Sequence, residues 1–212
     1  MQKGLFPLMV FLLASFVAAA QPPGFKKVAD TAYIRQKINE VASKTNSINT
    51  EFVQEKNLSF LDEKIISKGI LLYKKPDMLR LEYISPYSYL LIINNGKLHI
   101  KSDDSEIKVD LESSKMFNEI NDLIINSIQG KILNMPDLST EFYEDDNSFF
   151  IRLHPEQEEL KKYINTIELF IGKKDYTVTN FKVIELSDDY TLIKFINKKI
   201  NEEIPDERFN TE

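Results

Sequence analysis

Most of this sequence alternates apolar and polar positions with a period of two, the pattern of a strand with one buried face. In one stretch the charged residues Arg80 and Glu82 alternate with Leu79, Leu81 and Tyr83. Turn sequences separate the alternating stretches, and Asn-Gly at 95–96 is a strong hairpin signal. The pattern predicts strands at 49–56, 65–74, 78–83, 89–93, 97–101, 107–111, 138–143, 149–154, 164–171, 178–186 and 191–197.

Two segments instead show the helical spacing of apolar residues. The first covers 29–43 and can be capped by Asp30 or Thr31. The second covers 115–130 and ends at Gly130. Its apolar stripe consists of Met116, Phe117, Ile120, Leu123, Ile124 and Ile128. A short polar piece at 155–162 has helical character, and 198–212 is expected to be an irregular tail.

Many strands at hairpin spacing with few helices predict a mainly β protein, an antiparallel barrel or a strongly curved sheet. The apolar face of such a sheet must be covered. Either its side chains fill the core, or the sheet curls around a cavity that the two helices close. The alternation alone leaves both open.

The N-terminus resembles a secretory signal peptide. Lys3 precedes an apolar run at 5–17, and three alanines at 18–20 precede Gln21. Cleavage after Ala20 would leave 21–212, a length that favours one domain. A membrane anchor is the alternative reading, although the run is shorter than the roughly 20 residues that span a bilayer.

Composition excludes several functions. The formal net charge of −6 argues against a nucleic-acid partner, which needs a basic surface. There is no cysteine, hence no disulfide, thiolate nucleophile or lipid-bearing cysteine at the cleavage site. The sequence has no G-x-S-x-G elbow, no Walker loop, no dinucleotide-binding fingerprint and no H-x-x-x-H pattern. We therefore expect no enzyme activity and no cofactor.

The two histidines and the aspartate pairs can be explained by structural roles without a catalytic or metal-binding function. His99 lies between Leu98 and Ile100 and is expected to point away from the apolar face, and His154 lies at a strand end. A metal site is not expected from these two. The aspartate pairs at 103–104, 145–146 and 188–189 fall in predicted turns, where side-chain hydrogen bonding explains them.

The order of several stretches resembles the periplasmic outer-membrane lipoprotein carrier family, LolA. They are "INTEFVQEK" at 48–56, "SKGILLYKKPDMLRLEY" at 67–83 and "LLIINNGKLHI" at 90–100. The helical segment at 115–130 falls where the family has lid helices, and 165–209 resembles its late hairpins and final region. The order and spacing carry the resemblance, because none of these motifs is diagnostic alone.

The resemblance implies an incomplete antiparallel β-barrel closed by a helical lid around a hydrophobic cavity. The family's cargo is the acyl chains of lipoproteins, released by an inner-membrane ABC transporter and passed to an outer-membrane acceptor without covalent chemistry. A periplasmic monomer is expected. The expected lid residues are Phe117, Ile120 and Ile124, and the expected cavity residues are Phe52, Leu71, Tyr73, Leu79, Leu81, Tyr83, Leu91, Ile93, Leu98, Ile100, Ile167, Leu169, Ile193 and Phe195.

One position departs from the family pattern. Members often have arginine before the motif proline, where it latches the lid, and Lys75 stands there in this chain. Lysine lacks the planar fork of arginine and makes fewer fixed hydrogen bonds. Two interpretations remain open for each of two features. Lys74 and Lys75 form either a latch or a solvated turn. The apolar stripe at 115–130 forms either a lid or ordinary core packing. Relatives that carry glycolipids or sense lipoproteins share the fold, and a secreted hydrolase is a more distant alternative.

Overall fold

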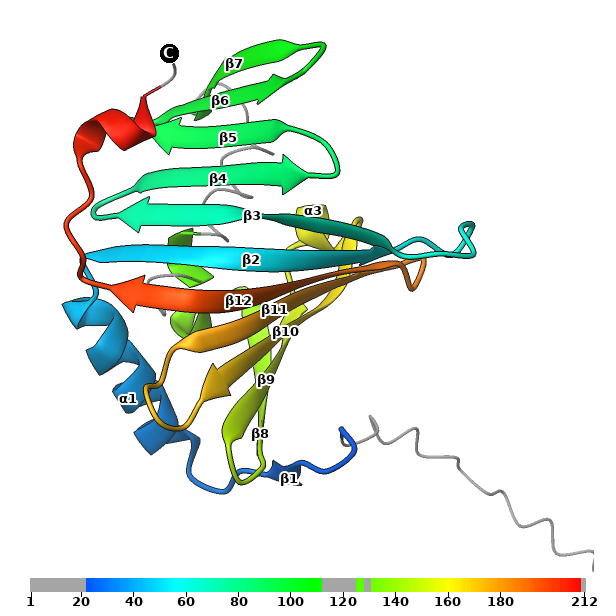
Figure 1. The fold of residues 1–212 in the computed structure, drawn as a ribbon. Coiled ribbons are helices and arrows are strands. Elements are labelled where there is room, and N and C mark those ends of the chain that lie inside the picture. The colour runs from blue at the N-terminus through cyan, green and yellow to red at the C-terminus, as the bar shows by residue number, and fades with distance from the viewer. Residues whose placement is uncertain (1–21, 112–124, 128–130, 211–212) are drawn as a thin grey trace, which may run out of the picture.

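The computed structural model describes residues 22–111, 125–127 and 131–210. Twelve strands form one antiparallel sheet in the order β1-β8-β9-β10-β11-β12-β2-β3-β4-β5-β6-β7 (Figure 1). The sheet bends so that β8–β11 turn away from the plane of β3–β7. Its edge strands, β1 and β7, do not pair with each other, so the sheet is open and not a closed barrel.

The element boundaries follow the predicted pattern closely. The strands are β1 (Lys26–Lys27), β2 (Ser47–Asn57), β3 (Ile65–Lys74), β4 (Met78–Ser85), β5 (Tyr89–Asn94), β6 (Lys97–Ser102), β7 (Glu106–Asp110), β8 (Leu138–Glu144), β9 (Ser148–Pro155), β10 (Ile164–Gly172), β11 (Val178–Glu185) and β12 (Tyr190–Ile200). The α-helices are α1 (Thr31–Lys44) and α3 (Glu158–Lys161), and the 3-10 helices are η2 (Lys131–Asn134) and η3 (Asp206–Phe209).

The sheet consists of two runs of hairpin-connected strands, β2–β7 and β8–β12. They are joined by the antiparallel pair of β12 with β2, in which Phe195 lies opposite Phe52. Strands β7 and β8 are consecutive in the chain but lie far apart in the sheet. The connection between them therefore passes from the β7 edge to the other half of the sheet.

Helix α1 covers part of one face, which we call the inner face. The Asp30 carboxylate caps the helix by accepting from the amides of Ala32 and Tyr33, as the sequence predicts. Ile34 and Ile38 are buried in a cluster with side chains from β8, β9 and β10. The apolar side chains that show helical spacing in the sequence thus form the contact of α1 with the sheet.

Two apolar clusters occupy the inner face. The first joins α1 and η2 to β8–β10 and includes Ile132, Leu153 and Ile167. The second joins β2–β6 and includes Phe52 and Ile125. Of the predicted helix at 115–130, residues 125–127 are helical, and the rest of that segment lies outside the described residues.

The outer face carries ion pairs and a C-terminal segment. The carboxylate of Glu168 lies 3.3 Å from a guanidinium nitrogen of Arg152 and 3.7 Å from the Lys182 ammonium. These residues lie directly opposite one another on β9, β10 and β11. Cross-strand pairing of opposite charges stabilises this polar face.

The C-terminal segment 201–210, which we call the strap, crosses the outer face beside β3–β5. Ile204 and Phe209 are buried against Leu72. The Lys74 ammonium donates to the Ile204 carbonyl, at 2.8 Å. The predicted tail is therefore irregular but firmly packed.

Two features differ from the sequence expectations. Strand β1 was not predicted, because its two lysines have no apolar alternation. It is held by backbone pairing with β8, and Val28 donates to the Phe142 carbonyl at 2.9 Å. Strand β12 runs three residues beyond the predicted Asn197, into the expected tail.

The predicted signal peptide lies outside the described residues. No helix in the described ranges has the length and apolar content to cross a membrane.

Candidate functional site

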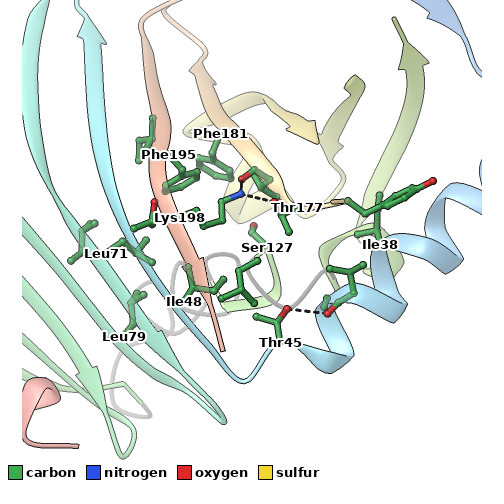
Figure 2. A pocket seen from close by; sticks show the side chains of 18 residues that line it. Ile38, Thr45, Ile48, Leu71, Leu79, Ser127, Thr177, Phe181, Phe195 and Lys198 are labelled. Atoms are coloured by element: carbon green, nitrogen blue, oxygen red, sulfur yellow. Dashed lines mark hydrogen bonds between the residues drawn. The ribbon is translucent and has the colours of Figure 1, made fainter. Parts of the chain in front are cut away.

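A cavity of about 150 Å³ lies on the inner face between α1 and the strands (Figure 2). Its walls come from α1 and from both halves of the sheet, where β12 and β2 meet. Among the described residues its lining is mostly apolar. The lining residues are Ile38, Val41, Ala42, Thr45, Ile48, Thr50, Leu71, Leu79, Leu81, Ser127, Tyr176, Thr177, Val178, Phe181, Ile193, Phe195, Lys198 and Ile200.

The strand register explains why these side chains share a face. Directly opposite residues of an antiparallel pair project to the same side. Leu71 lies opposite Leu81, and Phe181 lies opposite Ile193. A shift by one residue would move each set to the outer face. The alternation visible in the sequence therefore determines which strand side chains form the wall of the cavity.

All of the cavity residues expected from the sequence belong to the two inner-face clusters, but only some line the cavity. Ile167 and Leu169 lie in the first cluster, and the others lie in the second. The side chains at the cavity wall are Leu71, Leu79, Leu81, Ile193 and Phe195. The side chains that pack in the clusters away from this wall are Phe52, Tyr73, Tyr83, Leu91, Ile93, Leu98, Ile100, Ile167 and Leu169. Lipid contact remains a prediction for all of them.

Sequence reasoning missed several wall residues. Ile38, Val41 and Ala42 lie in the helix predicted at 29–43, and their helical apolar spacing could have identified them as part of a wall. Phe181 alternates with polar neighbours in β11 and could have been found in the same way. Lys198 had no signal, because simple alternation from Phe195 places it on the outer face.

The proposed latch residue Lys75 contacts α1. Its ammonium donates to the Ser43 carbonyl in the last turn of α1, at 2.6 Å. A cation at this end also interacts favourably with the helix dipole. Lys75 is thus positioned to hold α1 on the inner face. The expected lid residues Phe117, Ile120 and Ile124 lie outside the described residues, so a contact of Lys75 with them stays a prediction.

The polar groups of the cavity wall have hydrogen-bond partners. Thr45 donates to the Val41 carbonyl at 2.9 Å, and Thr50 donates to the Ile196 carbonyl at 2.8 Å. The Lys198 ammonium donates to the Thr177 hydroxyl and to the Val178 carbonyl, each at 2.6 Å. Burial lowers the pKa of Lys198 below its ordinary value, and the charge of Asp175 opposes this shift.

The histidines lie outside this cavity. His99 faces away from the inner clusters, as expected, but it is only 7% exposed, and its Nε2 lies 2.7 Å from the Glu106 carboxylate. His99 also lines a depression of the outer face that Phe209 and Asn210 of the strap line. Within the described ranges, no cluster of histidine and acidic residues could hold a metal ion.

Comparison with protein families decides the classification. Residues 43–212 match the family described as outer membrane lipoprotein carrier protein LolA. The chain belongs to the LolA family. The match covers most of the sequence and begins at the end of α1. A search of curated proteins finds no match.

Solved structures of distant proteins are similar in fold to this chain. A chain of the Pseudomonas aeruginosa MucA/MucB complex aligns with a TM-score of 0.52 and 10% identity, covering 85% of this chain and 60% of that one. An uncharacterised conserved protein from Thermus thermophilus aligns with a TM-score of 0.50 and 9% identity, covering 84% and 90%. A LolA superfamily protein from Nitrosomonas europaea has a TM-score of 0.45 and 8% identity, covering 84% and 96%. At these identities the likeness concerns the fold alone.

Proposed function

We propose that this LolA family protein is a periplasmic carrier that shelters the acyl chains of lipoproteins on their way from the inner to the outer membrane. The observation that supports this function most strongly is the apolar cavity beneath α1. Its walls give affinity for hydrocarbon without directional bonds, since each buried methylene contributes about 0.8 kcal/mol. Such a site needs no catalytic group.

The size of the cavity implies that loading requires movement. Its volume of about 150 Å³ is below the range of roughly 300–1,000 Å³ that is usual for ligand pockets. Several acyl chains fit only if α1, the proposed lid at 115–130, or both move away from the sheet. Lys75 would then be one of the contacts that open during loading.

Partners follow from this role. An ABC transporter in the inner membrane would deliver the cargo, and an acceptor in the outer membrane would receive it. The signal-like sequence at 1–20 agrees with export to the periplasm. A glycolipid carrier or a lipoprotein-sensing module with the same fold is the alternative, and the identity of the bound molecule separates these functions.

The first test is identification of molecules that co-purify with the protein from the periplasm, by mass spectrometry. Lipoproteins with intact acyl chains are the expected result. Glycolipid alone would replace the proposed cargo, and a soluble protein partner without lipid would favour the sensing module.

The second test uses a hydrophobic fluorescent probe that competes with lipid. Phe195 lines the cavity, whereas its neighbour Ile196 is 43% exposed on the outer face. Phe195→Gln is expected to weaken probe binding about tenfold, which corresponds to about 1.4 kcal/mol, and the matched control Ile196→Gln should leave it unchanged. An intact wild-type fold that binds no probe would exclude a lipid carrier.

A further inference from the structure

Lys198 is the one charged residue among the described residues that line the apolar cavity. In Figure 2 its side chain lies beside the rings of Phe181 and Phe195, and its nitrogen is directed toward Thr177. A charged group in apolar surroundings carries a cost unless it is paired. A carrier of uncharged hydrocarbon would not need this group in the wall.

A β-bulge directs Lys198 to the inner face. Ile196 lies opposite Glu51 and Lys199 lies opposite Asn49, so two residues of β12 face the single residue Thr50. Asn197 has a φ of 53° and is exposed. Without the extra residue, the alternation would place Asn197 on the inner face and Lys198 outside. Bulges are known to redirect side chains in this way.

The contacts of Lys198 orient its ammonium without neutralising it. Both of its hydrogen bonds, to the Thr177 hydroxyl and to the Val178 carbonyl, go to uncharged acceptors. The Thr177 hydroxyl in turn donates to the carboxylate of Asp175, at 2.7 Å. Asp175 is exposed, and among the described residues no carboxylate contacts the ammonium directly. Since an ammonium has three donors, its contacts with the described residues leave one N–H for a ligand.

We propose that Lys198 binds the carboxylate of a free fatty acid whose hydrocarbon tail occupies the cavity. A carboxylate supplies the missing negative charge and accepts the third N–H in a charge-assisted hydrogen bond. The cavity volume suits part of one chain better than several chains. The acyl groups of a lipoprotein are uncharged esters and amides, so they would not use this cation fully. This inference rests on the proposed function, because it requires that the cavity accepts acyl chains.

The test compares dodecanoate with dodecanol, which have the same chain length and differ in head-group charge. Displacement of the hydrophobic probe is measured at neutral pH, below the concentrations at which either amphiphile forms micelles. The wild type is expected to bind dodecanoate about tenfold more tightly than dodecanol, as a charge-assisted bond allows. Dodecyl phosphate, included as a third amphiphile, shows whether any anionic head is accepted or a carboxylate is preferred.

Two variants assign the preference to one side chain. Lys198→Gln keeps a hydrogen-bond donor and removes the charge, so it should abolish the preference by lowering the affinity for dodecanoate about tenfold, to that for dodecanol. Lys199→Gln is the matched control, because Lys199 is exposed and pairs with Glu202 at 3.1 Å. This control should retain the wild-type preference. Circular dichroism verifies that both variants are folded.

The outcomes separate this inference from the proposed function. Equal wild-type affinity for dodecanoate and dodecanol, or a preference that survives Lys198→Gln, overturns the fatty-acid site and leaves the carrier function standing. Tighter binding of dodecyl phosphate than of dodecanoate overturns the choice of carboxylate. Absence of binding by the probe and by all three amphiphiles overturns both proposals. The wild-type comparison requires no variant, so equal affinities overturn the fatty-acid site even if Lys198→Gln does not fold.

Discussion

At the scale of single residues, Gly69 shows how the inner face accommodates large aromatic rings. It lies between Phe52 and Tyr83 in the strand register, and these rings meet edge-to-face with centroids 5.0 Å apart. A β-carbon on Gly69 would lie 2.0 Å from the Glu82 carbonyl oxygen and 2.6 Å from the Phe52 ring. The two rings can therefore meet across β3 only because this position has no side chain.

Gly69→Ala is consequently expected to destabilise the protein by about 3 kcal/mol, the upper part of the range for overpacked cores. Urea denaturation measures the change. Gly172→Ala is the control, because a β-carbon there would first meet a side-chain oxygen of Asp175, at 3.0 Å, which can move. Equal stability of the two variants would contradict the packing argument.

Lys198 gives a pH dependence of stability. Its folded pKa is lowered by burial, so between that value and about 10.4 the unfolded chain binds more protons than the folded chain. The free energy of unfolding of the wild type should therefore rise with pH relative to Lys198→Met, which has no such group. Urea denaturation of both proteins at pH 7 and pH 10 measures this difference. A constant or falling difference would show that burial does not penalise the charge.

At the scale of elements, α1 is fixed to the sheet at both ends by different kinds of contact. Near its start, Arg35 is part-buried, donates to the Leu133 carbonyl and the Thr140 hydroxyl, and lies over the Phe142 ring. At its end, Lys75 and Asn201 donate to carbonyls of the last turn in solvent-exposed hydrogen bonds. The solvated end has fewer desolvated contacts to break, so we expect α1 to open from its C-terminus.

Two adjacent lysines test this expectation, because Lys75 holds α1 whereas Lys74 holds the strap. Lys75→Ala should accelerate association of the hydrophobic probe several-fold in stopped-flow measurements, with a loss of stability below about 1 kcal/mol, as for other exposed contacts. Lys74→Ala should lower stability by about 1 kcal/mol, the usual contribution of a hydrogen bond, without changing the association rate. Faster association in Lys74→Ala but not in Lys75→Ala would exclude the latch.

The sequence predicted the elements better than it predicted the site. Period-two alternation and turn residues located every strand from β2 to β12, because each has one apolar face and ends at a recognisable turn. Strand β1 was not predicted, because its two lysines are held by backbone hydrogen bonds and show no alternation of apolar and polar residues. The inward direction of Lys198 was not predicted for a different reason. A single bulge reverses which side chains of β12 face inward, and bulges have no fixed sequence signature. The family resemblance predicted a contact of Lys75 with the lid at 115–130, whose residues 115–124 and 128–130 lie outside the described ranges, and it did not predict the contact of Lys75 with α1.

At the scale of the whole molecule, the pairing of β12 with β2 joins the two halves of the sheet. The cavity lies at this junction, with Thr50 on one side and Phe195 on the other. Strands that lie near opposite ends of the sequence must meet before the cavity has a continuous wall. The site is therefore a property of the complete sheet and not of either half.

Removal of β12 should thus have a far larger effect than removal of the strap. A chain that ends at residue 187 leaves β2 and β11 as unpaired edges and is expected to aggregate. A chain that ends at residue 203 keeps the whole sheet and should remain soluble, with a lower melting temperature because the contacts of Phe209 are lost. Sedimentation and thermal unfolding measure these effects. A soluble, folded chain that ends at residue 187 would show that the halves are independent.

The same pairing has a consequence for biosynthesis. Strand β2 leaves the ribosome early, yet its neighbour β12 is among the last segments to be made, and synthesis proceeds at about 5–20 residues per second. For several seconds each nascent copy carries β2 with one edge paired to β3 and the other edge unpaired, in a cell where many identical copies are made together. To prevent aggregation of the unfinished polypeptide through this edge, another molecule, such as a holding chaperone, must then cover β2 until β12 has been synthesised.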